Sequence, residues 1–174
     1  SSDLANTMSE KPVAIITGGS RGVGAATAKM LADNGWNVLI TCSTSIAEAE
    51  IVAKKCSSKT SEVFALQADV AKHTDCEATI NMAVKKWGRI DALVNNAGTT
   101  KFVWDHSNLN GLDANDFQYI YGVNVVGPFQ MVKAAKEHLL RAANSCVVNV
   151  SSIAGLKGIG SSLAYASSKG ALNT

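Results

Sequence analysis

Short apolar segments alternate along the chain with longer segments that carry a helical pattern of apolar residues. The short segments are rich in β-branched residues and do not alternate apolar with polar side chains, which is typical of strands covered on both faces. The expected strands are residues 13–17, 37–42, 62–67, 90–95 and 146–150. The expected helices are residues 25–34, 45–56, 73–87, 113–143 (with a break near Gly122 or Gly127-Pro128) and one that begins near Leu163.

Strands and helices that alternate at these spacings predict right-handed parallel crossovers. The expected fold class is therefore α/β, a doubly wound parallel sheet of the Rossmann type with helices on both faces. Residues 1–10 are expected to be a flexible lead or tag remnant. Residues 11–174 are expected to form one nucleotide-binding domain.

Composition narrows the class of protein. The chain has 174 residues, of which 47% are hydrophobic, so it can bury a core, and its net charge of +2 does not indicate nucleic acid or an anionic membrane as partner. No apolar run could span a bilayer and no signal peptide is evident, so we expect a cytoplasmic location, with an organelle not excluded. The four cysteines are scattered and are expected to be reduced and buried. The three histidines lack ligand spacing, so no metal site is expected.

A glycine-rich turn follows the first expected strand and contains Gly18, Gly22 and Gly24. Such a turn lets the backbone approach a pyrophosphate, which then rests on the positive end of the next helix. The spacing is G-x-x-x-G-x-G rather than the G-x-G-x-x-G of the standard fingerprint. A tight turn also needs glycine for purely structural reasons, so the position after the first strand is what favours a cofactor.

The end of the second expected strand indicates which nicotinamide cofactor is bound. An NAD site usually has an acidic residue there to hold the ribose diol, but this chain has Thr41-Cys42-Ser43-Thr44. Arg21 adds a cation within the glycine turn, which suits a 2′-phosphate. We therefore expect NADP(H) to be favoured over NAD(H). The alternative is that Arg21 faces solvent and the site accepts either cofactor.

Tyr165 and Lys169 are four residues apart, so they lie on one face of the last expected helix, and Ser152 lies at the mouth of the loop that precedes it. A phenol is a poor acid or base at neutral pH, but a neighbouring ammonium group favours the phenolate and makes proton transfer easier. A serine hydroxyl can hold a carbonyl or alcohol oxygen beside the phenol. These three groups predict proton transfer at the carboxyl end of the sheet.

Taken together, the motifs resemble the short-chain dehydrogenase/reductase family. The resemblance covers residues 12–174. The extended branch of the family, with the motif G-x-x-G-x-x-G, fits less well because Arg21 occupies the position of its second glycine. The motifs occur in the order of the family. They are Thr17-Gly18-x-x-x-Gly22-x-Gly24, Asp69-Val70, Asn95-Asn96-Ala97-Gly98, Asn124, Ser152 and Tyr165-x-x-x-Lys169.

The resemblance implies a catalytic role for four residues. Tyr165 would be the acid/base, Lys169 would assist it and bond the nicotinamide ribose, Ser152 would hold the substrate oxygen, and Asn124 would anchor a water that relays protons to Lys169. Asn124 can alternatively satisfy a kinked helix backbone, and the two roles can coexist. Lys101, His106 and Lys157 are expected to be solvated surface.

The resemblance also implies the cofactor contacts. Asp69 and Val70 would contact the adenine, although Asp69 can alternatively stabilise a strand-to-helix turn or cap. Asn95, Ala97 and Gly98 would line the cleft. The full expected set is Gly18, Ser20, Arg21, Gly22, Val23, Gly24, Ser43, Thr44, Asp69, Val70, Asn95, Ala97, Gly98, Tyr165 and Lys169.

Members of the family continue beyond the position of Thr174 with a strand, a nicotinamide-contacting loop and a substrate lid. The sequence is therefore expected to be an incomplete domain, and three explanations stay open: an ordered part of a longer chain, a truncated product, or completion by another chain. The last expected strand would be an apolar sheet edge.

The expected activity is NADPH-dependent reduction of a carbonyl, such as a 3-oxoacyl group, to an alcohol, because the chain looks most like 3-oxoacyl-acyl carrier protein reductases and broad carbonyl reductases. The substrate itself, a small carbonyl or alcohol or an acyl-carrier compound, is not derivable from these residues. A homodimer or homotetramer is expected at full length. The alternative is a catalytically silent nucleotide-binding or regulatory protein.

Overall fold

A parallel sheet of five strands forms the centre of the computed structural model, which describes residues 9–174. The strands are β1 (Val13–Ile16), β2 (Asn37–Cys42), β3 (Val63–Gln67), β4 (Ala92–Asn95) and β5 (Cys146–Asn149). Their order in the sheet is β3-β2-β1-β4-β5, and every neighbouring pair is parallel. The direction of winding reverses beside β1, and in open α/β sheets a ligand crevice forms at such a point.

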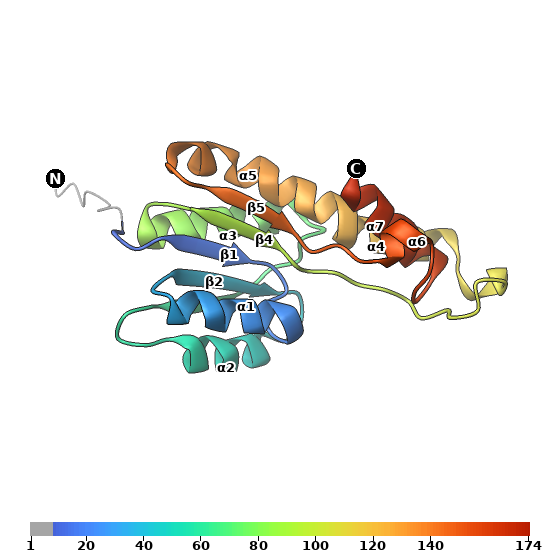
Figure 1. Ribbon diagram of the computed structural model, residues 1–174, viewed down its shortest axis with the longest axis horizontal. Coiled ribbons are helices and arrows are strands. Elements are labelled where there is room, and N and C mark those ends of the chain that lie inside the picture. Colours follow the sequence, from blue (N-terminus) through green and yellow to red (C-terminus); the bar gives the residue numbers. More distant parts are fainter. Residues whose placement is uncertain (1–8) are drawn as a thin grey trace.

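Helices cover both faces of the sheet, as the sequence pattern predicts. They are α1 (Gly22–Asp33), α2 (Ile46–Cys56), α3 (His73–Trp87), α4 (Ala114–Tyr121), α5 (Gly127–Arg141), α6 (Ala154–Lys157) and α7 (Leu163–Asn173), with a short 3₁₀ turn at Leu109–Gly111. Figure 1 shows α1 and α2 on one face and α3 and α5 on the other. One core cluster packs side chains of α1 and α2 on the sheet, and a second packs those of α3 and α5, which confirms the doubly wound α/β fold.

The helical region expected at residues 113–143 is not broken but contains a π-helical turn at Gly122–Val126, between α4 and α5. The π-turn accommodates one extra residue per turn without ending the helix, and such turns are frequent at functional sites. Pro128, which has no N–H to donate, directly follows this turn at the start of α5. The expected break is therefore a local widening of a continuous helix, with Asn124 inside it.

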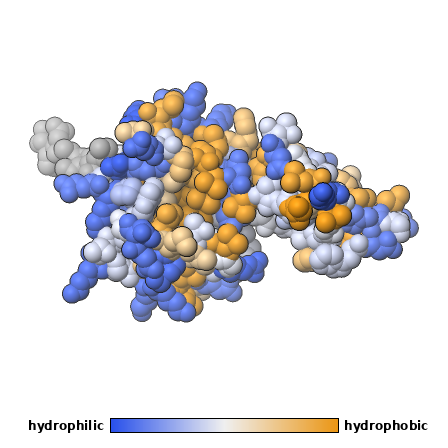
Figure 2. Space-filling view, viewed as in Figure 1, coloured by the Kyte–Doolittle hydropathy of each residue, from blue (hydrophilic) through white to orange (hydrophobic). Residues whose placement is uncertain are grey.

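At the edge of the sheet, β5 has a paired neighbour on one side only, among the described residues. All four of its residues are exposed, including Val147 at 40% and Val148 at 48%. Figure 2 shows apolar surface where β5 runs in Figure 1. The expectation of a buried Cys146 is therefore wrong, because a strand at the edge does not cover its own side chains. Cys42, Cys56 and Cys76 are buried, and all four cysteines are free thiols.

Two further expectations concern the N-terminal lead and membrane-spanning helices. Residues 1–8 lie outside the described part, so the lead expected at residues 1–10 is described only at its end, where the Ser9 N–H donates to the Trp87 carbonyl at 2.7 Å. Within residues 9–174, none of the helices has the length and apolar character needed to cross a bilayer.

A buried carboxylate joins the beginnings of β1 and β4. Asp91, whose side chain is 7% exposed, accepts the backbone N–H of Val13 at 2.8 Å and forms a two-pronged ion pair with Arg89 at 2.6 and 2.9 Å. Two strands distant in sequence are thereby held in register at their amino ends, opposite the ligand crevice. Paired, hydrogen-bonded charges of this kind stabilise a fold only while both partners remain.

We predict that Asp91→Ala lowers the free energy of unfolding by about 2–4 kcal/mol, because it leaves the Val13 N–H without its side-chain acceptor and the Arg89 guanidinium with only the Ser9 carbonyl. Asp33→Ala is the matched control, since it removes a carboxylate from the exposed Lys29–Asp33 pair on α1 and should leave the unfolding midpoint nearly unchanged. Urea denaturation followed by circular dichroism measures both. Equal effects from the two variants would contradict the role assigned to Asp91.

Candidate active site

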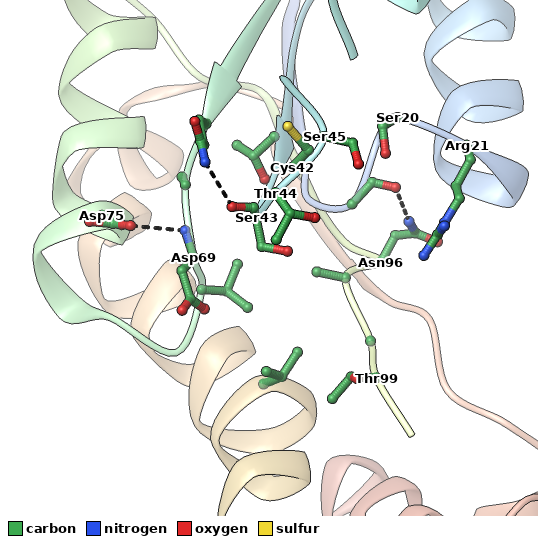
Figure 3. Close-up of a pocket in the computed structure, with 18 of the residues that line it drawn as sticks. Ser20, Arg21, Cys42, Ser43, Thr44, Ser45, Asp69, Asp75, Asn96 and Thr99 are labelled. Carbon is green, nitrogen blue, oxygen red and sulfur yellow. Dashed lines mark hydrogen bonds between the residues drawn. The ribbon is translucent and has the colours of Figure 1, made fainter. Parts of the chain in front are cut away.

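A cleft of about 950 Å³ opens at the carboxyl ends of the strands, between the loops that follow β1, β2, β3 and β4. Figure 3 shows this cleft, with Ser20 and Arg21 on one side and Asp69 and Asp75 on the other. Its volume lies at the upper end of the range for sites of small molecules and cofactors. The expected cofactor residues that line it are Gly18, Ser20, Arg21, Val23, Ser43, Thr44, Asp69, Val70, Ala97 and Gly98.

The glycine turn presents an open helix end to this cleft. Helix α1 begins after Arg21, has no side-chain cap and carries no acidic residue in its first turn, so its positive end is free to receive an anion. Gly24 does not line the cleft, but a β-carbon there would lie 2.3 Å from the Gly18 carbonyl oxygen. Gly24 therefore permits the close turn between β1 and α1.

Asn96 fixes the loop after β4 against the glycine turn. Its amide nitrogen donates to the carbonyl oxygens of Thr17 (3.0 Å) and Gly18 (2.9 Å), while the Thr17 hydroxyl accepts the backbone N–H groups of Asn96 and Ala97 at 3.1 and 3.0 Å. Asn96 also lines the cleft, whereas Asn95 is 2% exposed and donates to Asn149 on β5. The expected set thus named Asn95 where Asn96 faces the cleft, although both belong to the same motif.

Hydroxyl groups line the cleft where β2 ends. Ser43 and Thr44 are exposed side chains that line the cleft, and Figure 3 shows Arg21 extending from the start of α1 beside Asn96. Cys42 and Ser45 line the same region and were not anticipated, because nothing in their residue types marks them. No carboxylate stands at the end of β2, so the cleft offers neutral and positive groups there.

Asp69 has the structural role that the sequence left open for it. Its side chain accepts the backbone N–H of Ala71 at 3.0 Å, and its own N–H donates to Asp75 at 2.9 Å, so the carboxylate stabilises the turn between β3 and α3. It lines the cleft as well, together with Lys72 and Asp75, which were not anticipated. A contact between Asp69 and an adenine stays a prediction.

Lys169 is a buried ammonium group on α7. It is 4% exposed, its Nζ donates to the Val150 carbonyl oxygen at 2.8 Å, and burial lowers its pKa from the ordinary value. Nζ lies 5.8 Å from the centre of the Tyr165 ring, on the face of α7 that the four-residue spacing predicts. A β-carbon added to Gly98 would lie 3.6 Å from Nζ, so the ammonium group stands directly behind the cleft lining.

Ser152 and Tyr165 lie on the two segments that meet beside Lys169. The Ser152 hydroxyl accepts the Ala154 N–H at 3.1 Å at the start of α6, a short helix that the sequence pattern did not predict. Tyr165 is half-buried in the first turn of α7, where its N–H donates to the capping hydroxyl of Ser162 at 3.2 Å. Neither Tyr165 nor Lys169 lines the cleft itself.

Asn124 uses its side chain to fasten neighbouring segments. Its Oδ1 accepts the Thr99 N–H at 2.8 Å, and its Nδ2 donates to the Thr99 carbonyl and to the Ser168 hydroxyl, both at 3.0 Å. These contacts correspond to the structural alternative, in which the residue satisfies a distorted helix. The water relay to Lys169 stays a prediction.

Two residues expected to be solvated surface have partners. Lys101 pairs with Asp116 at 2.7 Å, and a ring nitrogen of His106 lies 3.0 Å from the Gly160 carbonyl oxygen. Both contacts hold the loop after β4 near α4 and the start of α7. Lys101 and Lys157 are exposed as expected, whereas His106 is partly buried because the loop folds back on the chain.

Comparison with known proteins gives a consistent picture. The sequence model described as "short chain dehydrogenase" matches residues 12–174. A protein of Streptomyces violaceoruber, provisionally named ketoacyl reductase 2 of the granaticin polyketide synthase, is 38% identical over 96% of this chain. A 3-oxoacyl-[acyl-carrier-protein] reductase of Synechocystis is 33% identical over 90% of it. The chain spans somewhat less than two thirds of the length of these relatives, 65% and 62% respectively.

Solved structures with 28–42% sequence identity to this chain share its fold. A crystal structure from Burkholderia xenovorans, provisionally described as a short-chain dehydrogenase/reductase, has a TM-score of 0.91 and 42% identity, covering 95% of this chain and 69% of its own. A Burkholderia phymatum structure in complex with NAD has a TM-score of 0.83 at 28% identity, covering 94% and 57%. A metagenomic short-chain oxidoreductase in complex with NADP has a TM-score of 0.84 at 28% identity, covering 95% and 72%.

Close packing of α6 on α7 gives a prediction about how the site is held together. A β-carbon on Gly155 would lie 2.6–2.8 Å from backbone atoms of Lys169 and Gly170, so Gly155→Ala must push the two helices apart. We expect a loss of about 1–3 kcal/mol in the free energy of unfolding, the usual cost of overpacking.

Gly122→Ala is the control for this variant. A β-carbon there would meet only the Ala71 side chain at 3.7 Å, an ordinary contact, and alanine favours helix over glycine. Thermal unfolding of both variants should give a clear decrease for Gly155→Ala and none for Gly122→Ala. An unchanged midpoint for Gly155→Ala would show that α6 does not hold α7 in place.

Proposed function

This chain belongs to the short-chain dehydrogenase/reductase family, and on that basis we propose that the protein is an NADPH-dependent reductase that converts a ketone to an alcohol. The observation that carries the proposal is the position of Lys169. Its buried ammonium lies on the Tyr165 face of α7 and immediately behind Gly98 of the cleft. A charge held out of water in this way is costly, and such groups concentrate at functional sites.

The cleft fits a dinucleotide. The uncapped start of α1 and the close approach of Gly24 to Gly18 suit the pyrophosphate, and the loop from Asn96 to Gly98 leads from there to Lys169. When bound, the nicotinamide supplies the hydride. We propose that the remaining steps are proton transfers and hydrogen bonds made by the side chains beside Lys169.

In this mechanism Ser152 donates a hydrogen bond to the carbonyl oxygen of the substrate and holds it beside Tyr165. Tyr165 gives its proton to that oxygen as the carbonyl carbon becomes a carbinol, so the product is a neutral alcohol. The Lys169 ammonium stabilises the phenolate that Tyr165 becomes and bonds the ribose of the cofactor. Oxidation of an alcohol is the same sequence in reverse.

The proposed preference for NADPH over NADH rests on the groups at the end of β2. Arg21, Ser43 and Thr44 could hold a 2′-phosphate by charge-assisted and neutral hydrogen bonds, and no carboxylate is present there to repel it. Solved relatives are described in complex with NAD and with NADP, so the choice depends on this chain's own residues.

We propose a 3-oxoacyl compound or a similar ketone, free or on an acyl carrier, as substrate, because relatives at 33–38% identity are named as ketoacyl or 3-oxoacyl reductases. We also propose a homodimer or homotetramer that forms through the α4–α5 and α7 helices. Exposed apolar residues on α5 support this, including Phe129 at 66% and Leu140 at 71%.

Tyr165→Phe tests the reaction. In the full-length protein we expect at least a ~100-fold loss of kcat, because the proton donor is removed, while the Kd for NADPH stays within about twofold. Tyr121→Phe, which removes a phenol from α4 outside the proposed site, is the matched control. NADPH oxidation with a panel of ketones and β-ketoesters gives the rates, and near-normal turnover by Tyr165→Phe would refute the assignment. NADPH binding with no turnover by the parent would favour a silent nucleotide-binding protein.

Arg21→Ala tests the cofactor preference. The parent protein should bind NADPH more tightly than NADH, and the variant should lose about tenfold in NADPH affinity with NADH affinity unchanged, because only the 2′-phosphate is lost as a partner. Lys29→Ala, which removes a positive charge farther along α1, should change neither affinity. Fluorescence titration measures all six dissociation constants, three proteins with two cofactors each. Equal affinities of the parent for the two cofactors would overturn the preference.

A further inference from the structure

Two neighbouring serines on α7 make the same local hydrogen bond in different surroundings. The Ser167 hydroxyl donates to the Ala164 carbonyl at 3.1 Å, and the Ser168 hydroxyl donates to the Tyr165 carbonyl at 2.7 Å, each three residues back along the helix. Ser167 is exposed, whereas Ser168 is completely buried at 0%. Any special role of Ser168 must therefore come from a contact that Ser167 lacks.

That contact is with Asn124. The Ser168 hydroxyl accepts the Asn124 Nδ2–H at 3.0 Å, using a lone pair while its own hydrogen goes to Tyr165. Asn124 is 1% exposed, so an Nδ2–H that lost this acceptor would have no water to replace it. The hydroxyl thus connects the backbone of the proposed acid/base to the π-turn at Gly122–Val126.

Asn124 carries the connection on to the cleft. It exchanges hydrogen bonds with both backbone groups of Thr99, the residue that follows Gly98 in the cleft lining. A β-carbon on Gly98 would lie 3.5 Å from Asn124 Oδ1 and 3.6 Å from Lys169 Nζ, so the end of this loop, the π-turn and the ammonium group converge. The spacing between the cleft wall and the catalytic face of α7 is therefore set through Asn124 and Ser168.

We propose that Ser168 is a positioning residue, which holds the Tyr165–Lys169 face of α7 at a fixed distance from the cleft wall through Asn124 and Thr99. Its role in turnover rests on the function proposed above, but the connection itself does not. Hydrogen-bonded buried networks of this kind specify one geometry while every member is satisfied. Removal of the Ser168 hydroxyl leaves one Asn124 Nδ2–H without an acceptor, and we expect the two hydrogen bonds between Asn124 and Thr99 to weaken as a result.

The first test does not need activity. The Thr99 N–H donates to Asn124 Oδ1, so its rate of exchange with deuterium reports whether Asn124 is held. In Ser168→Ala we expect this rate to rise about tenfold, the effect of one unsatisfied buried donor, while Ser167→Ala leaves it unchanged. Equal Thr99 exchange in the two variants would overturn the proposal. Should Ser168→Ala fail to fold, Ser168→Cys keeps the volume with a weaker acceptor and should show a smaller rise in the same direction.

The second test uses turnover in the full-length protein. Ser168→Ala should lower kcat about tenfold with the Kd for NADPH within about twofold, whereas Ser167→Ala should keep both, since only the first displaces the catalytic face. Adding Ser168→Ala to Asn124→Ala should cost little more than Asn124→Ala alone, because both remove one connection. If the two substitutions instead reduced kcat by independent factors that multiply, the shared connection would be contradicted. If the parent shows no turnover, the proposed reductase function fails, and the Thr99 exchange rates still decide the positioning role.

Discussion

The ammonium group of Lys169 donates to the carbonyl oxygen of Val150, 2.8 Å away, and so joins α7 to the residue just beyond β5. Val150 in turn donates to the Asn95 carbonyl at 2.9 Å, which places it in register with the end of β4. Through these two bonds the helix that carries Tyr165 is fixed to the sheet rather than to a loop. The position of the proposed chemistry therefore depends on the pairing of β5 with β4.

The buried ammonium group of Lys169 lowers the stability of the fold. Burial lowers the pKa of Lys169, so its charged form is less favourable in the folded chain than in the unfolded one, and the charged group reduces stability at neutral pH. A hydrophobic residue of similar length would not carry this cost. A buried cation beside a tyrosine, at the back of a large cleft, is the kind of local conflict with stability that marks a functional site.

The sheet and most helices could be predicted from the sequence because burial on both faces of a strand leaves a plain apolar run, and caps and glycines mark helix ends. The π-turn could not, because its cause is tertiary: Asn124 is held by Thr99 and Ser168 from other segments. Helix α6 is too short to show a period, and the exposure of Cys146 depends on where β5 lies in the sheet, not on its apolar sequence.

The candidate site could likewise be predicted only in part, because some of its residues are placed by tertiary structure. Arg21, whose charge marks it in the sequence, lines the cleft as expected, whereas Asn96 and Cys42 line it because of where β4 and β2 end. The most direct test of the account is a crystal structure of the full-length protein with NADPH. The account predicts the diphosphate on the backbone N–H groups at the start of α1 and the nicotinamide ribose within hydrogen-bonding distance of Lys169 Nζ. A cofactor bound elsewhere, or a ribose out of reach of that ammonium, would contradict it.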